Sequence, residues 1–225
     1  MMRMRAWTHA MVIAALAAIC VTAEAQAQGW NYPSFQIPEI TVREFNFAVA
    51  DGGDAGNSLV AQWREGISSA TQLTFDAGFA DPDGRDNSHF VLGGGVAHQL
   101  TRATQDMPLA LVFTAGLYGA FGDPTNIFRL PVGVSVGHRF GTQSGVAITP
   151  YVHPRLSLDF CSSDRFCGGD DSDLSVNFDL GSDFQLTREL AIRASVLFGS
   201  SDLFGNDDTG FGISVAWKPG ARAPR

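Results

Sequence analysis

The sequence contains no apolar run long enough to cross a membrane as a helix. The longest, Met11 to Val21, is about a dozen residues, well short of the roughly 20 that a spanning helix needs. Basic residues are also scarce: 15 Lys and Arg stand against 23 Asp and Glu, giving a formal net charge of −8. Because no basic stripe interrupts this acidic balance, the sequence gives no support to nucleic-acid binding.

The first residues have the organisation of a secretory signal peptide. Arg3 and Arg5 give a positive start, Met11 to Val21 supply the apolar region, and small residues from Ala23 to Ala27 offer cleavage sites. A short membrane anchor is excluded because the apolar run is too short. We therefore predict a signal peptide over residues 1–27 and export of the remaining chain.

Cysteine is rare, with three residues in the whole sequence. Cys20 follows Ile19, where a lipoprotein signal would have a small residue, so lipidation is not expected. The exported part of the chain has an even number of cysteines, Cys161 and Cys167, which predicts one disulfide closing a short loop. Two thiols with no adjacent His fall short of a four-ligand metal site, and no metal or cofactor is expected.

Strict alternation of apolar and polar residues is the main positive signal. In Thr71 to Ala80, one face carries Leu73, Phe75, Ala77 and Phe79, and the other carries Gln72, Thr74, Asp76 and Gly78. The same alternation recurs in ten segments, which we predict as strands: Thr41–Ala50, Ser58–Glu65, Thr71–Ala80, His89–Leu100, Leu109–Phe121, Phe128–Phe140, Val146–Phe160, Leu174–Leu186, Leu190–Phe198 and Phe211–Trp217.

The polar face of these strands distinguishes a soluble sandwich from a membrane barrel. A sandwich fills its inner face with large apolar side chains. Here the second face combines Gly, Ala and Ser with eight charged residues, namely Glu44, Arg64, Asp76, Arg129, Arg155, Asp179, Asp183 and Arg193. Such a face cannot fill a dry core, so the large apolar side chains must point outward. A closed barrel in lipid satisfies this requirement because it leaves no strand edge unpaired.

We therefore predict an all-β, antiparallel, up-and-down transmembrane β-barrel of ten strands over residues 41–217. An irregular lead-in on the periplasmic side covers residues 28–40, where Pro33 and Pro38 interrupt any ladder, and a C-terminal tail covers 218–225. Pro131, Pro150 and Pro154 each remove a ladder donor, which leaves eight strands with one hairpin outside as the alternative.

The position of aromatic residues at strand ends fits the interfaces of a bilayer. One end of the outward face carries Phe79, Phe90, Phe121, Phe128, Phe160 and Phe211, and the other carries Trp63, Phe140 and Trp217. The five longer connections hold more than half of the acidic residues, so we expect one end of the barrel to be acidic and to face outward from the cell.

The signal peptide, the alternating segments and the last strand from Gly210 to Trp217 together resemble the small Gram-negative outer-membrane β-barrels of the OmpA-like and opacity-like group. That resemblance implies an outer-membrane location, contact with outer-membrane lipid and lipopolysaccharide, and recognition of the final strand by the barrel assembly machinery. Gly212, Val215 and Trp217 match the family's final-strand pattern, whereas the tail from Lys218 to Arg225 continues past it.

Function is less constrained than fold. The inward charges predict bidentate acid–arginine pairs that plug a narrow lumen, and a porin-like pore lined by both signs is the alternative. A surface hydrolase or acyltransferase using His89 with Asp86 and Ser88 at the rim is a weaker alternative, and we expect no enzyme. Acidic loops such as Asp170 to Asp173 lack the calcium-loop pattern. Gly93 to Gly95 lies in mid-strand without a following helix, which predicts close packing rather than a phosphate loop.

Overall fold

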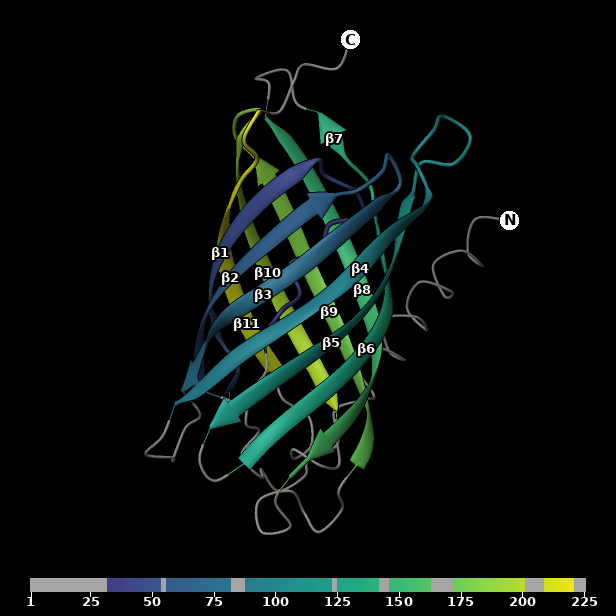
Figure 1. The fold of residues 1–225 in the computed structure, drawn as a ribbon. Helices are drawn as coiled ribbons and strands as arrows, with labels where there is room; N and C mark the ends of the chain where they lie inside the picture. Colours follow the sequence, from purple (N-terminus) through teal and green to yellow (C-terminus); the bar gives the residue numbers. More distant parts are fainter. Residues whose placement is uncertain are drawn as a thin grey trace, which may run out of the picture.

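The computed structural model describes residues 32–53, 56–81, 88–122, 125–141, 146–162, 172–200 and 209–220. The elements of these ranges are β-strands in one antiparallel sheet that curls into a tube (Figure 1). The strands are β1 (Arg43–Asp51), β2 (Asn57–Gly66), β3 (Thr71–Asp81), β4 (His89–Thr101), β5 (Ala110–Gly122), β6 (Thr125–Gly137), β7 (Phe140–Gly141), β8 (Ala147–Cys161), β9 (Ser172–Gln185), β10 (Leu190–Ser200) and β11 (Thr209–Trp217). The predicted signal peptide, Cys167 and Asp86 lie outside the described residues.

The sheet closes on itself. Its order runs β6-β5-β4-β3-β2-β1-β11-β10-β9-β8-β7, and an additional β6–β8 pairing joins the two ends. The first and last strands pair directly, with Phe45 opposite Trp217 and Asp51 opposite Phe211. The ten long strands confirm the predicted up-and-down barrel, and β7 is a two-residue addition beside β8.

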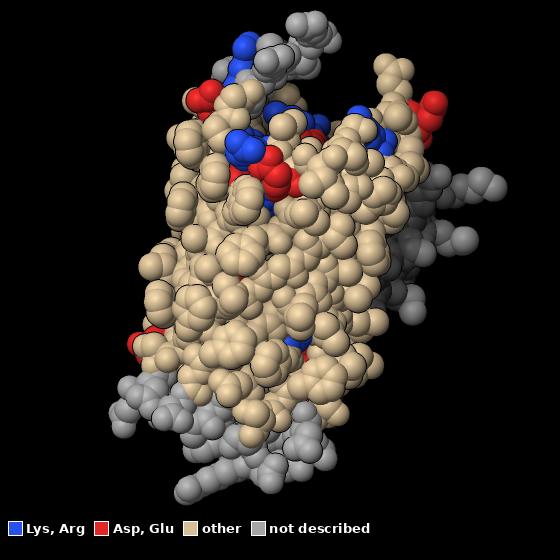
Figure 2. All heavy atoms as spheres, viewed as in Figure 1, with Lys and Arg blue, Asp and Glu red and all other residues tan. Residues whose placement is uncertain are grey.

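The alternation of exposed and buried side chains follows the prediction along the wall. In β11, for example, each residue from Thr209 to Trp217 alternates between exposed and buried. Among the described residues, 35 large apolar side chains are exposed on the outside. Figure 2 shows this wall as almost free of charged atoms, which gather mainly at one rim. A surface of this kind is the inverse of a soluble protein, whose exterior carries the charges.

The two ends of the barrel differ in their connections. Short connections at residues 67–70, 102–109 and 186–189 lie at the end of the tube that carries β7, and we call this the turn end (Figure 1). Lys218 lies there too, since its N–H donates to the Glu189 carbonyl at 2.7 Å. The longer connections at the opposite, loop end fall largely outside the described residues. Strand β1 starts at the turn end and runs toward the loop end.

Two of the prolines that weighed against ten strands coincide with interruptions of a ladder on one side only. The β5–β6 pairing is interrupted at Gly116–Leu117, opposite Pro131, and the β6–β8 pairing at Val134–Ser135, opposite Pro154. The other ladder of each strand keeps its register through the proline. Because each proline lacks an N–H donor toward one neighbouring strand only, the barrel accommodates it with all ten strands in the wall.

Pro150 explains where the predicted sixth strand divides. The sequence predicts one strand from Phe128 to Phe140, but β6 ends at Gly137 and β7 begins at Phe140. The break faces Pro150, where the His138 N–H reaches the Pro150 carbonyl at 3.3 Å. The prediction of one continuous strand was therefore wrong at its last three residues.

The described part of the predicted lead-in, residues 32–40, is irregular, and it lies inside the barrel and not beyond it on the periplasmic side. Residues 32–41 have no strand structure, yet Tyr32, Phe35 and Ile37 are buried inside the tube. The chain runs through the lumen toward the turn end, where Thr41 precedes β1. We call residues 32–41 the luminal segment. Polar lumen walls bind its backbone, which is why it lies inside rather than beyond the barrel.

Candidate functional site in the barrel lumen

Two arginines and two carboxylates form the most buried ion-pair cluster of the lumen. Arg193, from β10, donates from Nη1 and Nη2 to the two oxygens of Glu44 at 2.7 Å each, and from Nε to Asp183 at 2.7 Å. Arg64, from β2, donates to the same Glu44 at 2.9 Å. The Arg193 side chain is 0% exposed, so contacts among these four groups replace their contacts with water.

Lys218 extends this cluster at the turn end. Its Nζ donates to Gln185 at 2.5 Å and lies 3.9 Å from Glu44. Burial lowers the pKa of Lys218 below its ordinary value, while the Glu44 carboxylate opposes that shift. The sequence analysis assigned Lys218 to the tail, although its position one residue after Trp217 continues the inward face of β11.

A second cluster surrounds Asp179 on β9. Arg155 donates to Asp179 at 2.8 Å, and His153 Nδ1 lies 3.6 Å from the same carboxylate. The two nitrogens of His153 contact the hydroxyls of Ser34 at 2.7 Å and of Thr114 at 2.9 Å. Asp179 thus links strands β8 and β9 to the luminal segment.

The sequence predicts that each inward acid forms an ion pair with an inward arginine, but the remaining predicted charges have other partners. Arg129 binds Asp159 at 3.1 Å, an acid that the predicted network omitted. Asp76 accepts hydrogen bonds from Gln62 at 2.8 Å and from Tyr32 at 3.2 Å instead of from an arginine. Asp159 could have been found from the alternation, because it lies two residues beyond the inward Ser157.

The luminal segment is held mainly through its backbone. Arg64 donates to the carbonyls of Ser34 and Phe35 at 3.0 Å, and Arg193 donates to the Phe35 carbonyl at 3.3 Å. Asp179 accepts from the Ser34 N–H at 3.0 Å and from its hydroxyl at 2.5 Å. The same charged residues that neutralise one another therefore also fix this segment in place.

Toward the turn end, uncharged side chains continue the same backbone recognition. Ser135 donates to the Gln36 carbonyl at 2.7 Å, and Gln99 donates to the Pro38 carbonyl at 3.0 Å. Gln99 and Gln72 accept from the N–H groups of Ile40 at 3.2 Å and Thr41 at 3.0 Å. The wall thus supplies hydrogen-bond partners for main-chain groups of an irregular segment that has no sheet partner.

Phe35 and Pro38 fit places where the wall has glycine. A Cβ on Gly212 would lie 2.6 Å from the Phe35 ring, and one on Gly137 would lie 3.0 Å from the Pro38 ring. Phe35 is fully buried and has a φ of 50°, the only positive φ of a non-glycine residue among the described positions. Such a conformation persists only where surrounding contacts fix it.

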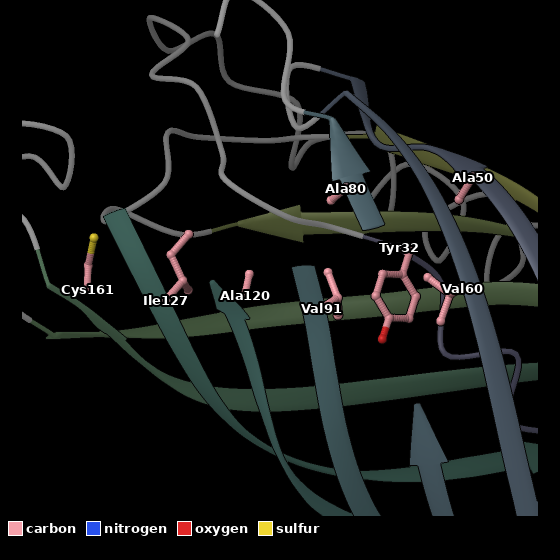
Figure 3. Packing of buried hydrophobic residues seen from close by; sticks show 8 residues of the cluster. All are labelled: Tyr32, Ala50, Val60, Ala80, Val91, Ala120, Ile127 and Cys161. Atoms are coloured by element: carbon pink, nitrogen blue, oxygen red, sulfur yellow. The ribbon is translucent and has the colours of Figure 1, made fainter. Parts of the chain in front are cut away.

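Toward the loop end, the lumen contains an apolar cluster. Figure 3 shows a cluster of small and medium apolar side chains with the Tyr32 ring among them: Tyr32, Ala50, Val60, Ala80, Val91, Ala120, Ile127 and Cys161. A cavity of about 70 Å³, lined by both apolar and polar side chains, borders Asp76, Arg129 and His153. Its size accommodates only a few water molecules.

The other sequence-predicted residues have the following positions. All nine interface aromatics are exposed on the outer surface. Cys161 is disulfide-bonded, and its predicted partner Cys167 lies outside the described residues. His89 is buried and faces the lumen beside Gly122, so the expectation of an exposed His89 at the rim was wrong, because His89 begins the inward face of β4.

The part of the chain that the structure describes contains no group of three or more His, Cys, Asp or Glu side chains suited to a metal ion. Nor does it contain a helix of the length and apolarity needed to cross a membrane.

Comparison with known proteins gives distant structural likenesses. No protein-family model matches the sequence, and no curated protein matches it. Among solved structures, 43 chains match. They include the β domain of the Bordetella autotransporter BrkA, with 13% identity, a TM-score of 0.44 and coverage of 78% of this chain and 97% of that chain. LpxR from Salmonella typhimurium has 10% identity, a TM-score of 0.47 and coverage of 77% and 99%. Neisserial surface protein A has 18% identity, a TM-score of 0.35 and coverage of 78% and 94%.

Proposed function

We propose that this chain is an integral outer-membrane β-barrel with a closed lumen and a structural or surface-interaction role. The inverted polarity of the tube carries the proposal: its exterior is a continuous apolar belt, while its interior buries paired charges. A closed barrel leaves no unpaired edge in lipid. The OmpA-like and opacity-like group, contact with lipopolysaccharide and delivery by the barrel assembly machinery belong to the same proposal.

A closed lumen is supported by the balance of charge and by the luminal segment. Each buried arginine of the lumen binds a carboxylate, and the segment fills the space toward the turn end. Unpaired charge would be costly in so narrow a tube. A narrow channel is the second candidate, favoured by the cavity of about 70 Å³ that the ion-paired Arg129 and Arg155 border.

Planar-bilayer recording of the purified, detergent-refolded protein separates the two candidates. The closed barrel predicts no discrete current steps over a range of voltages, whereas the channel predicts steps that change on Arg129→Glu. Gel mobility before and after boiling serves as the control for folding, because a barrel that stays folded in detergent migrates differently from the unfolded chain. An absence of current steps is evidence for a closed lumen only in samples that this control shows to be folded.

A further inference from the structure

We infer that the barrel lumen is a peptide-binding channel for an extended polypeptide, with the luminal segment as its resident ligand. This inference deepens the proposed function and rests on it, because a binding channel occupied by the chain itself is what closes the tube. It adds the class of ligand, the groups that recognise it, and the consequence that the ligand can be exchanged.

The pattern of hydrogen bonds supports recognition of a peptide backbone. Main-chain groups of Ser34, Phe35, Gln36, Pro38, Ile40 and Thr41 bind side chains from β2, β3, β4, β6, β9 and β10. Side chains from six strands thus converge on one irregular segment of the chain. Most of these bonds would form with any sequence, since each peptide unit offers the same groups.

Selectivity comes from the place where Phe35 packs. Gly212 leaves a hollow that any other residue would fill, because a Cβ there would approach the Phe35 ring to 2.6 Å. On the wall side, Ala50 lies at the edge of this hollow, 3.2 Å from the same Cβ position, while Pro33 of the luminal segment itself lies 3.3 Å from it. The channel therefore favours an aromatic residue at this point of a bound peptide.

The strained backbone of Phe35 supports a fitted ligand over a loosely packed tail. A φ of 50° is uncommon for a phenylalanine, and the Arg64 and Arg193 bonds to its carbonyl hold it there. If Phe35 loses its ring, the strain remains and the hollow empties. The segment should then leave the channel for part of the time.

The test uses the full chain with Phe35→Ala and a synthetic peptide of residues 32–41 as the probe. The wild-type protein is expected to be silent in planar bilayers, and the variant to show current steps. Micromolar peptide should close these steps. A peptide with Ala in place of Phe35 should need at least tenfold more to close them. Phe47→Ala is the matched control, since Phe47 is exposed on the outer wall and touches no luminal group.

A second variant tests the hollow from the wall side. Gly212→Val places a side chain where the Phe35 ring packs, so it should also produce steps. The peptide should close the current steps of Phe35→Ala but not those of Gly212→Val, because in Gly212→Val the valine side chain fills the hollow. The heat-dependent gel mobility of each variant verifies that the barrel has folded.

The outcomes separate this inference from the proposed function. Steps in the wild-type protein would overturn the closed lumen. A silent wild type with a folded but silent Phe35→Ala variant would overturn only the peptide channel. Steps that the peptide leaves unchanged in Phe35→Ala, or equal steps in Phe47→Ala, would also overturn the channel.

Discussion

Arg193 is the side chain on which most of the buried charge converges. It binds Glu44 through two nitrogens and Asp183 through a third, and it is fully buried. Removing it would leave Asp183 without this ion pair, and Glu44 with Arg64 at 2.9 Å and the more distant Lys218 at 3.9 Å. We expect Arg193→Ala to lower the free energy of unfolding by about 3–5 kcal/mol, the cost of breaking a buried ion pair. Urea unfolding in detergent micelles or lipid vesicles, followed by the gel-mobility shift, measures this loss.

Arg43 provides the matched control for that substitution. It forms a comparable pair with Glu65 at 2.7 Å, but on the outer surface at the turn end, where its side chain is 51% exposed. Exposed pairs contribute little because water replaces the lost partner. Arg43→Ala should therefore leave the unfolding midpoint nearly unchanged. Equal losses in the two variants would contradict the assignment of Arg193 to a buried network.

Alternation in the sequence predicts which side of the wall a strand residue faces, but it does not predict partners that lie far away along the chain. Seven of the eight predicted charges are buried inside the tube, and Arg155, whose side chain is 15% exposed, binds the buried Asp179 there. Alternation could not show that Asp76 binds Tyr32, because that contact joins β3 to an irregular segment 44 residues earlier. The luminal segment has no periodic pattern of its own, so nothing local to residues 32–41 indicated that the wall would bind its backbone.

At the scale of single elements, β4 and β5 approach each other closely through glycine. The ring of Tyr118 lies against Gly93, where a Cβ would be 1.9 Å from Cδ1, and against Gly116, where a Cβ would be 2.5 Å from Cε2. This confirms the predicted close packing of the Gly93–Gly95 run. Gly93 admits this large inward ring in mid-strand, whereas a Cβ at Gly95 would instead lie 2.6 Å from the Ala115 carbonyl oxygen.

A side chain at Gly93 should therefore destabilise the barrel. We expect Gly93→Ala to cost about 1–3 kcal/mol through overpacking against Tyr118. In a double-mutant cycle with Tyr118→Ala, the two substitutions should couple favourably, because removing the ring removes the clash. Gly94→Ala is the control: its Cβ would point outward and meet only the Thr74 carbonyl at 3.3 Å. Additive effects at Gly93 and Tyr118 would contradict this explanation.

The prolines of β6 and β8 illustrate what strand prediction can and cannot decide. The sequence alone indicates that each proline lacks a donor, and this kept the eight-strand alternative open. It does not indicate which neighbouring strand lacks the hydrogen bond. Each missing N–H donor faces a point where the ladder is interrupted. For Pro131 this is the gap between β5 and β6, for Pro150 the break between β6 and β7, and for Pro154 the gap between β6 and β8. Ten strands are therefore compatible with all three.

At the scale of the whole molecule, the barrel should respond to surface charge in the opposite way from a soluble protein. Phe47 lies midway along β1 and is 57% exposed on the apolar belt. In water, replacing an exposed Phe by Arg would be neutral or would improve solubility. In a bilayer, the same change places a charge near the midplane, which costs about 2–4 kcal/mol in a transmembrane barrel. We therefore expect Phe47→Arg to lower the unfolding free energy in lipid vesicles by that amount.

Depth makes this prediction specific to a membrane. Val42 is 84% exposed but lies at the turn end, before β1 begins, where a bilayer would give way to water. Val42→Arg should cost about 0–1 kcal/mol, since the penalty of a charged side chain falls off toward the interface. Urea unfolding of both variants in vesicles of a single lipid provides the comparison. If Phe47→Arg were as mild as Val42→Arg, the apolar belt could not be facing lipid, and the exterior would need a protein partner to cover it.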